Sequence, residues 1–110
     1  MSYIIEFDKL PWNEPVVGLR YKIFISGNQQ IRLAEFSEGF IEPDWCSKGH
    51  AGYVLDGAFT TEFCNGNTER YQKGDIVFIP PGEQSKHKAI LGKGGKVTLL
   101  EFENIILGDQ

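Results

Sequence analysis

The sequence is poor in cysteine, histidine and basic residues, and it has no long apolar run. It contains two cysteines, two histidines and 11 basic residues against 15 acidic ones, which gives a net charge of −4. A general nucleic-acid binder needs a basic surface, so this charge argues against that class. No apolar run approaches the length that spans a bilayer. We therefore expect neither nucleic acid nor a membrane as a partner.

The start of the chain and the two cysteines bear on cellular location. Residues 1–6 lack the basic stretch followed by a long apolar segment that marks a signal peptide. Without an export signal, Cys46 and Cys64 are expected to be reduced thiols rather than a disulfide. We expect a cytoplasmic protein.

Glycine and aromatic residues are abundant, and they predict β-structure. The 13 glycines, eight phenylalanines and four tyrosines suit short strands joined by tight turns. Gly27-Asn28, Asp56-Gly57 and Asn65-Gly66 are typical of two-residue hairpin turns, so residues 52–71 are expected to form a three-stranded meander. About seven or eight short strands, with no helical window between them, indicate a sandwich or barrel of one domain. The expected strands include residues 19–25, 31–36, 52–55, 58–63, 68–71, 76–79, 87–91 and 97–102.

Two stretches of the chain resemble the cupin superfamily of small β-barrels. Residues 74–82 read Gly-Asp-Ile-Val-Phe-Ile-Pro-Pro-Gly and match the second cupin motif, in which five residues separate a glycine from Pro-x-Gly. Residues 49–57 end in Tyr-Val-Leu-Asp-Gly and match the end of the first motif. The resemblance covers residues 16–102 and implies an antiparallel double-stranded β-helix, or jelly-roll barrel, of the small single-domain (cupin 2-like) type. Residues 1–110 would then form a single cupin domain.

The resemblance also implies where a divalent metal would bind. Metal-binding cupins have His-x-His and a Glu in the first motif and a His after the second. Counted from Gly57, the His-x-His positions are Asp44 and Cys46, and the Glu position is His50. The second-motif position is Ser85, and His87 follows two residues later. The chain departs from the pattern at all four places, so its metal motif is degenerate.

The residues at these places still form a chemically coherent set. Asp44, Cys46 and His50 have the same parity, so an extended chain would direct all three to one face. Ser85 and His87 likewise share a face, and His50, His87 and Ser85 are expected to line a ligand pocket. A carboxylate, a thiolate and two imidazoles can hold Zn²⁺, Fe²⁺ or Ni²⁺. The candidate metal ligands are therefore His50, His87, Cys46 and Asp44.

Other interpretations of these residues remain open. Cys46 can be an inert buried thiol, and Asp44 can simply end a turn. In a fully extended strand, Cys46 and His50 would lie about 13 Å apart, so only His87 could activate the thiol. Glu101 and Glu103 are interpreted as ordinary exposed strand residues. Core or cavity positions are expected for six phenylalanines: Phe24, Phe36, Phe59, Phe63, Phe78 and Phe102.

Two functional hypotheses follow. The first is a cupin whose inward-facing polar pocket around His50 and His87 binds a divalent metal, a small ligand, or both, with the reaction unspecified. The alternative is a metal-free, non-catalytic barrel that binds a ligand or another protein. In either case a homodimer is expected, because the apolar segments at residues 3–7 and 105–107 can pack on the barrel or pair with the edge strand of another subunit.

Overall fold

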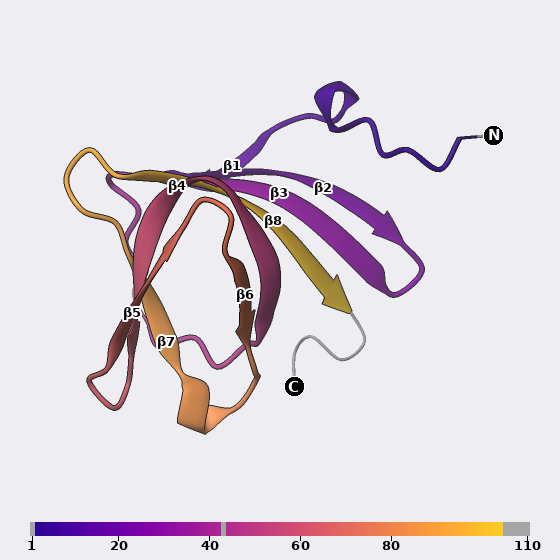
Figure 1. Cartoon of the computed structure of the whole chain (residues 1–110). Helices are drawn as coiled ribbons and strands as arrows, with labels where there is room; N and C mark the ends of the chain where they lie inside the picture. Colours follow the sequence, from indigo (N-terminus) through magenta and orange to yellow (C-terminus); the bar gives the residue numbers. More distant parts are fainter. Residues whose placement is uncertain (1, 43, 105–110) are drawn as a thin grey trace.

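The computed structural model describes residues 2–42 and 44–104, and this part of the chain is almost entirely β-structure (Figure 1). Its strand pairings are all antiparallel, which confirms the predicted all-β jelly-roll class. Two 3₁₀ helices, Phe7–Lys9 and Glu83–Ser85, are the only helical segments described, and neither is long and apolar enough to cross a membrane. The strands are β1 Asn13–Val16, β2 Leu19–Ser26, β3 Gln29–Ser37, β4 His50–Phe63, β5 Thr68–Gln72, β6 Ile76–Ile79, β7 His87–Ile90 and β8 Lys96–Asn104.

Strand β4 connects the two halves of the barrel. Strands β1, β2, β3, β8 and β4 are neighbours in that order. Residues 50–57 of β4 pair with β8 and β6, whereas residues 58–63 pair with β5 and β7. One strand of 14 residues therefore belongs to both halves, and Figure 1 shows the sheet curling back on itself.

The expected hairpin turn at Asp56-Gly57 is wrong. Strand β4 continues through these residues without reversing direction, and its pairing with β8 shifts register between Val54 and Asp56. Gly57 has a φ of 77°, which serves a β-bulge as well as a turn. The turn at Gly27-Asn28 does join β2 to β3, and Asn65-Gly66 lies in the turn from β4 to β5.

The core is built from side chains that alternate with exposed ones along the strands. Its buried side chains come from β3, β4, β5, β6 and β8, and each buried valine or leucine contributes about 1.5–3 kcal/mol. Phe36, Phe59 and Phe63 pack against this core. The core is centred on Ala34, Val54, Tyr71, Val77, Ile79, Val97 and Leu99.

The opposite face of the sheet is also apolar, and this was not expected. Phe78 is 73% exposed and Phe102 is 48% exposed, so the prediction that they line the interior is wrong. Val77, next to Phe78, and Leu99, three positions before Phe102, are buried. Side chains an odd number of positions apart in a strand lie on opposite faces, so these phenylalanines are on the outside. A cross-strand register row runs through Phe24, Ile31, Phe102, Ala51 and Phe78. We call these residues the outer row.

The bulge in β4 gives a test of this architecture. At Gly57, a Cβ atom would overlap the carbonyl oxygen of Lys96, and the positive φ strains any side chain. We expect Gly57→Ala to lower the free energy of unfolding by about 2 kcal/mol or more, measured by urea denaturation. Gly92→Ala is the control, because a Cβ there meets no atom within 4 Å. An equal loss in both variants would contradict a special role for the bulge.

Candidate metal site and cavity

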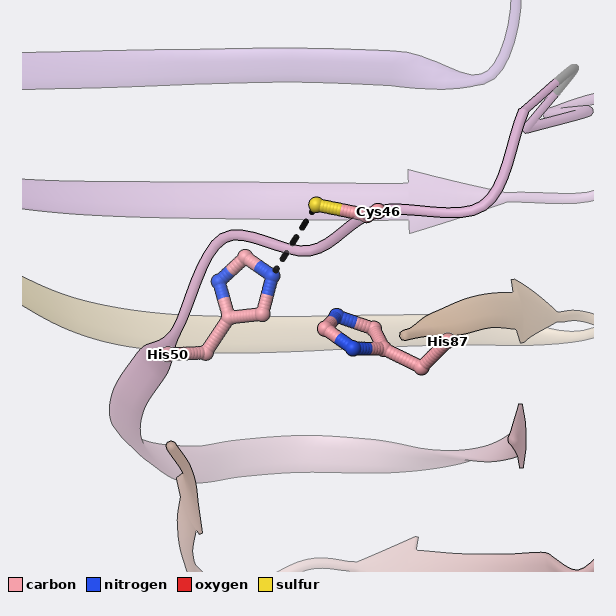
Figure 2. Close-up of side chains that lie close together, drawn as sticks. All are labelled: Cys46, His50 and His87. Atoms are coloured by element: carbon pink, nitrogen blue, oxygen red, sulfur yellow. Dashed lines mark hydrogen bonds between the residues drawn. The ribbon is translucent and has the colours of Figure 1, made fainter. Parts of the chain in front are cut away.

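Both histidines line one cavity of about 190 Å³ inside the barrel. His50 is the first residue of β4, and His87 is the first residue of β7. The centroids of the two rings lie 4.9 Å apart in an edge-to-face arrangement. Figure 2 shows the rings directed toward one another, with the sulfur of Cys46 beside them. The prediction that two imidazoles distant in sequence meet inside the barrel is confirmed.

The His87 ring has one satisfied nitrogen and one without a partner. The side chain is buried, and Nδ1 lies 2.8 Å from the carbonyl oxygen of Ser85. A carbonyl only accepts hydrogen bonds, so Nδ1 carries the proton of the neutral ring and Nε2 then carries the lone pair. Within the described residues, Nε2 of His87 is buried and has no hydrogen-bond partner. Leaving such an atom unpaired costs about 1–3 kcal/mol, which a bound ligand would offset.

Cys46 is held beside both histidines by backbone pairing. Its N–H donates to the carbonyl of His87 at 2.9 Å, and the N–H of His87 donates to the carbonyl of Cys46 at 3.0 Å. The chain then bends at Lys48 before β4 begins, and Sγ of Cys46 lies 4.0 Å from Nε2 of His50. The expectation of about 13 Å is wrong because it assumed an extended segment.

A glycine permits this bend to pack closely. At Gly49, a Cβ atom would lie 2.8 Å from the ring and backbone nitrogen of Pro81, closer than real Cβ atoms approach. The segment that carries His50 into β4 therefore rests directly on the Pro80-Pro81-Gly82 turn. The absence of a side chain at this position lets the loop fold back and bring Cys46 near His50.

The three donors fit a transition-metal ion. One ligand atom each from Cys46, His50 and His87 lies within 4.8 Å of the others. A thiolate and two imidazoles are ligands that zinc and related divalent ions accept. The unpartnered Nε2 of His87 lies in this group, so the residues present match the ion that the resemblance to cupins implied.

Two other predicted site residues occupy different places. Asp44 is exposed in a bend of the chain, and the structure does not bring its carboxylate into the group of three ligands. Strand alternation does not apply there, because the segment before Cys46 is not a strand. Ser85 is outside the cavity lining and contributes its backbone carbonyl to His87 instead. A role for either side chain in binding stays a prediction.

Glu101 belongs to the site although it was interpreted as an exposed residue. Its side chain is only 14% exposed, and Oε2 lies 3.8 Å from Nδ1 of His50. The Nε and Nη2 atoms of Arg32 donate to Oε1 at 2.9 and 2.7 Å. The exposed interpretation is therefore wrong. The alternation of Val97 and Leu99, which are buried on β8, would have placed Glu101 on the inner face.

Burial and nearby charges set the protonation of His50. Burial lowers the pKa of its imidazole below the usual 6.5. The carboxylate of Glu101 opposes this effect and raises the pKa, whereas His87, Arg32 and Lys48 lower it further. At neutral pH the ring is therefore uncharged and offers a lone pair. The contact with Glu101 favours a proton on Nδ1, which leaves Nε2 facing Cys46.

This lowered pKa predicts a pH-dependent stability of the metal-free protein. The unfolded chain takes up a proton at His50 at a higher pH than the folded protein does. The free energy of unfolding should therefore fall as the pH decreases from about 7.5 to about 5.5, measured by urea denaturation. His50→Gln should reduce the change in the free energy of unfolding over this pH range. If the change is the same in His50→Gln and the unmodified protein, His50 is not its source. The titratable and charged groups facing His50 are Cys46, Lys48, His87, Arg32 and Glu101.

Comparison with known proteins places the fold. No family model and no curated protein matches the chain. Among solved structures, the polyketide cyclase RemF from Streptomyces resistomycificus is 20% identical with a TM-score of 0.79, over 96% of this chain and 80% of that one. An RmlC-like cupin from Shewanella frigidimarina is 18% identical with a TM-score of 0.67, over 93% of this chain and 89% of that one.

A third structure, described as FeII HppE, is 15% identical with a TM-score of 0.70. The match covers 92% of this chain and 59% of that one. All three likenesses lie below the identity at which function can be transferred, so they bear on architecture. Together with the curled antiparallel sheet and the two motif stretches, they show that this chain has the cupin fold.

Proposed function

We propose that the protein binds one divalent transition-metal ion through Cys46, His50 and His87 and holds a small molecule in the adjoining cavity. The observation that carries this proposal is the buried Nε2 of His87, which has no partner among the described residues and lies in a group of three metal-ligand atoms. In a metal-free barrel, a hydrogen-bond donor of the ligand would satisfy this atom, but the sulfur and imidazole donors grouped with it would have no common role. The metal-binding hypothesis accounts for all three donors, so we favour it.

Each imidazole has a second contact that orients it toward an ion. Nδ1 of His87 donates to the Ser85 carbonyl, and Nδ1 of His50 faces Glu101, which Arg32 holds. Metal-ligating histidines commonly donate their other nitrogen to a carbonyl or carboxylate, which fixes the tautomer and raises the basicity of the ligating nitrogen. The roles of Glu101 and Arg32 in this proposal are to position His50.

The donor set favours zinc among the expected ions. A thiolate with two imidazoles is a soft-to-borderline donor set that suits zinc, whereas non-haem iron(II) sites typically combine two imidazoles with a carboxylate. The structure of FeII HppE shows that the same fold occurs in an iron(II) protein, which supports a transition metal in this one. A bound ion of this kind would supply a Lewis acid that polarises an oxygen atom of the ligand.

Spectroscopy of the cobalt-substituted protein tests the proposal. Cobalt(II) bound to a thiolate gives a sulfur-to-metal charge-transfer band in the near ultraviolet. We expect one equivalent of Co²⁺ to produce this band and one equivalent of Zn²⁺ to remove it. Cys46→Ser should abolish the band, and His87→Ala should weaken binding by about tenfold or more.

The second free cysteine provides a matched control. Cys64 is exposed and lies outside the group of three ligands, so Cys64→Ser should keep both the band and the affinity. Circular dichroism checks that each variant is folded. A band that persists in Cys46→Ser, or metal binding below one equivalent in the unmodified protein, would contradict the proposed site.

A reduced thiol at Cys46 is a condition of this function. Both cysteines of the structure are free, and a thiolate ligand is lost when the sulfur is oxidised. This condition supports our proposal that the protein works in a reducing compartment, such as the cytoplasm.

We also propose that the protein is a homodimer. The outer row exposes Phe78 and Phe102 on a sheet face that nothing in the described chain covers. Tyr3 and Ile4 are 93% and 77% exposed, so these two side chains do not pack on their own barrel, and Figure 1 shows the segment before the first 3₁₀ helix extending away. Farther along, the carbonyl oxygen of Phe7 accepts a hydrogen bond from Nζ of Lys22 on β2. Burying such a face against a second copy would remove apolar surface from water. The other terminal segment, residues 105–107, lies outside the described residues.

Sedimentation velocity tests the dimer. We expect the unmodified protein to sediment as a dimer at micromolar concentration and Phe78→Asp to sediment as a monomer, because a carboxylate cannot be buried in an apolar interface. Val17→Asp is the control, since Val17 is 78% exposed in the turn between β1 and β2, away from the outer row. A monomeric unmodified protein would overturn the proposal.

A further inference from the structure

We propose that the cavity selects an uncharged molecule built on a single aromatic ring, with one hydroxyl or carbonyl oxygen directed at His50 and His87. This inference rests on the proposed function, because the oxygen would face the ion held by these residues. The walls of the cavity favour the aromatic class for three reasons: their composition, the size of the space, and the pairing of its charged groups.

The wall away from the two histidines is apolar and rich in phenyl rings. Phe36 and Phe40 pack edge to face with their centroids 4.9 Å apart, and Phe59 lines the same space. Rings in such a setting present both edges and faces to an aromatic guest, which gains about 0.5–1.5 kcal/mol per ring pair beyond simple burial. A sugar or a polyacid would leave its hydroxyl or carboxylate groups unpaired against this wall. The apolar lining consists mainly of Leu19, Phe36, Phe40, Phe59, Leu91 and Leu99.

The size of the cavity limits the guest. The volume is about 190 Å³. An engineered apolar cavity of about 150 Å³ in another protein takes up benzene, so the present one accommodates one six-membered ring with one or two small substituents. A fused polycyclic molecule exceeds this space.

The charged groups of the lining are already engaged. Arg32 is paired with Glu101 inside the wall. Oε1 of Glu42 accepts the N–H of Ala89 at 2.8 Å, which uses a lone pair but leaves the negative charge. No free cationic side chain therefore faces the cavity among its lining residues, so an anionic guest of the metal-free protein would meet Glu42 without compensation. A divalent ion of the proposed function would be balanced by the Cys46 thiolate and the Glu42 carboxylate, which leaves no net positive charge for an anionic guest. Apart from Thr61 and Glu42, the polar groups that remain for a guest lie at the imidazole end.

Isothermal titration calorimetry with three probes tests the ligand class. The probes are 4-methylphenol, D-xylose and malonate, added to the zinc-loaded and to the metal-free protein. We expect 4-methylphenol to bind at least about tenfold more tightly than either polar probe, and more tightly with zinc than without it. Equal or tighter binding of D-xylose or malonate would overturn the inference.

A matched pair of substitutions locates the binding. Phe40→Ala removes a ring from the cavity wall and should weaken 4-methylphenol binding by about tenfold. Phe78→Ala makes the same change on the outer row and should leave binding unchanged. Ala89→Phe fills the cavity, so it should abolish 4-methylphenol binding while the zinc stoichiometry stays at one. Phe40→Ala and Ala89→Phe therefore test the same cavity independently. Equal effects of Phe40→Ala and Phe78→Ala would place the probe elsewhere.

The two proposals fail in different ways. If zinc does not bind but 4-methylphenol binds the metal-free protein and responds to Phe40→Ala, the ligand class stands and the metal site is wrong. If zinc binds with one equivalent and 4-methylphenol binds neither form, the metal site stands and the ligand class is wrong.

Discussion

The curvature of β4 is the constraint on which the site depends. His50 begins this strand, and Phe63 at its end pairs with His87 on β7. In a flat sheet, the two ends of a 14-residue strand would be more than 40 Å apart, at about 3.3 Å per residue. The bulge at Gly57 and the change of pairing partners curl the strand, so His50 at its start meets His87, the residue on β7 that pairs with the end of β4. The cavity is therefore a product of the bend in the sheet.

Local sequence patterns predicted the fold class well and one turn badly. Alternation and the glycine turns were sufficient for an antiparallel barrel, and the two motif stretches pointed to the cupin type. Asp56-Gly57 was misinterpreted because a hairpin and a bulge both require a positive φ at the glycine. What distinguishes them here is the pairing of Gly57 with Val97 on β8, a contact between residues far apart in the chain. Single-sequence patterns do not contain that information.

The site shows the same division between local and long-range information. His50 and His87 were found because strand parity and the motif positions agreed. Cys46 was assigned to the right face but at the wrong distance, since the bend at Lys48 depends on contact between Gly49 and Pro81. Glu101 was missed because a carboxylate in a strand is usually exposed. Its inward position is acceptable only because Arg32, 69 residues earlier in the sequence, pairs with it.

The Arg32–Glu101 pair argues for a functional polar end rather than for stability. A largely buried ion pair loses hydration energy, and replacing it with well-packed apolar residues is often neutral or stabilising. Apart from Glu42 and Thr61, the wall beyond the two histidines and this ion pair is apolar. Glu101 faces the nitrogen of His50 that points away from Cys46, and Ser85 does the same for His87. The costs of the ion pair and of the unpartnered His87 nitrogen thus fall at one end of the cavity. Both are accounted for when that end binds an ion and the apolar end binds the body of a ligand.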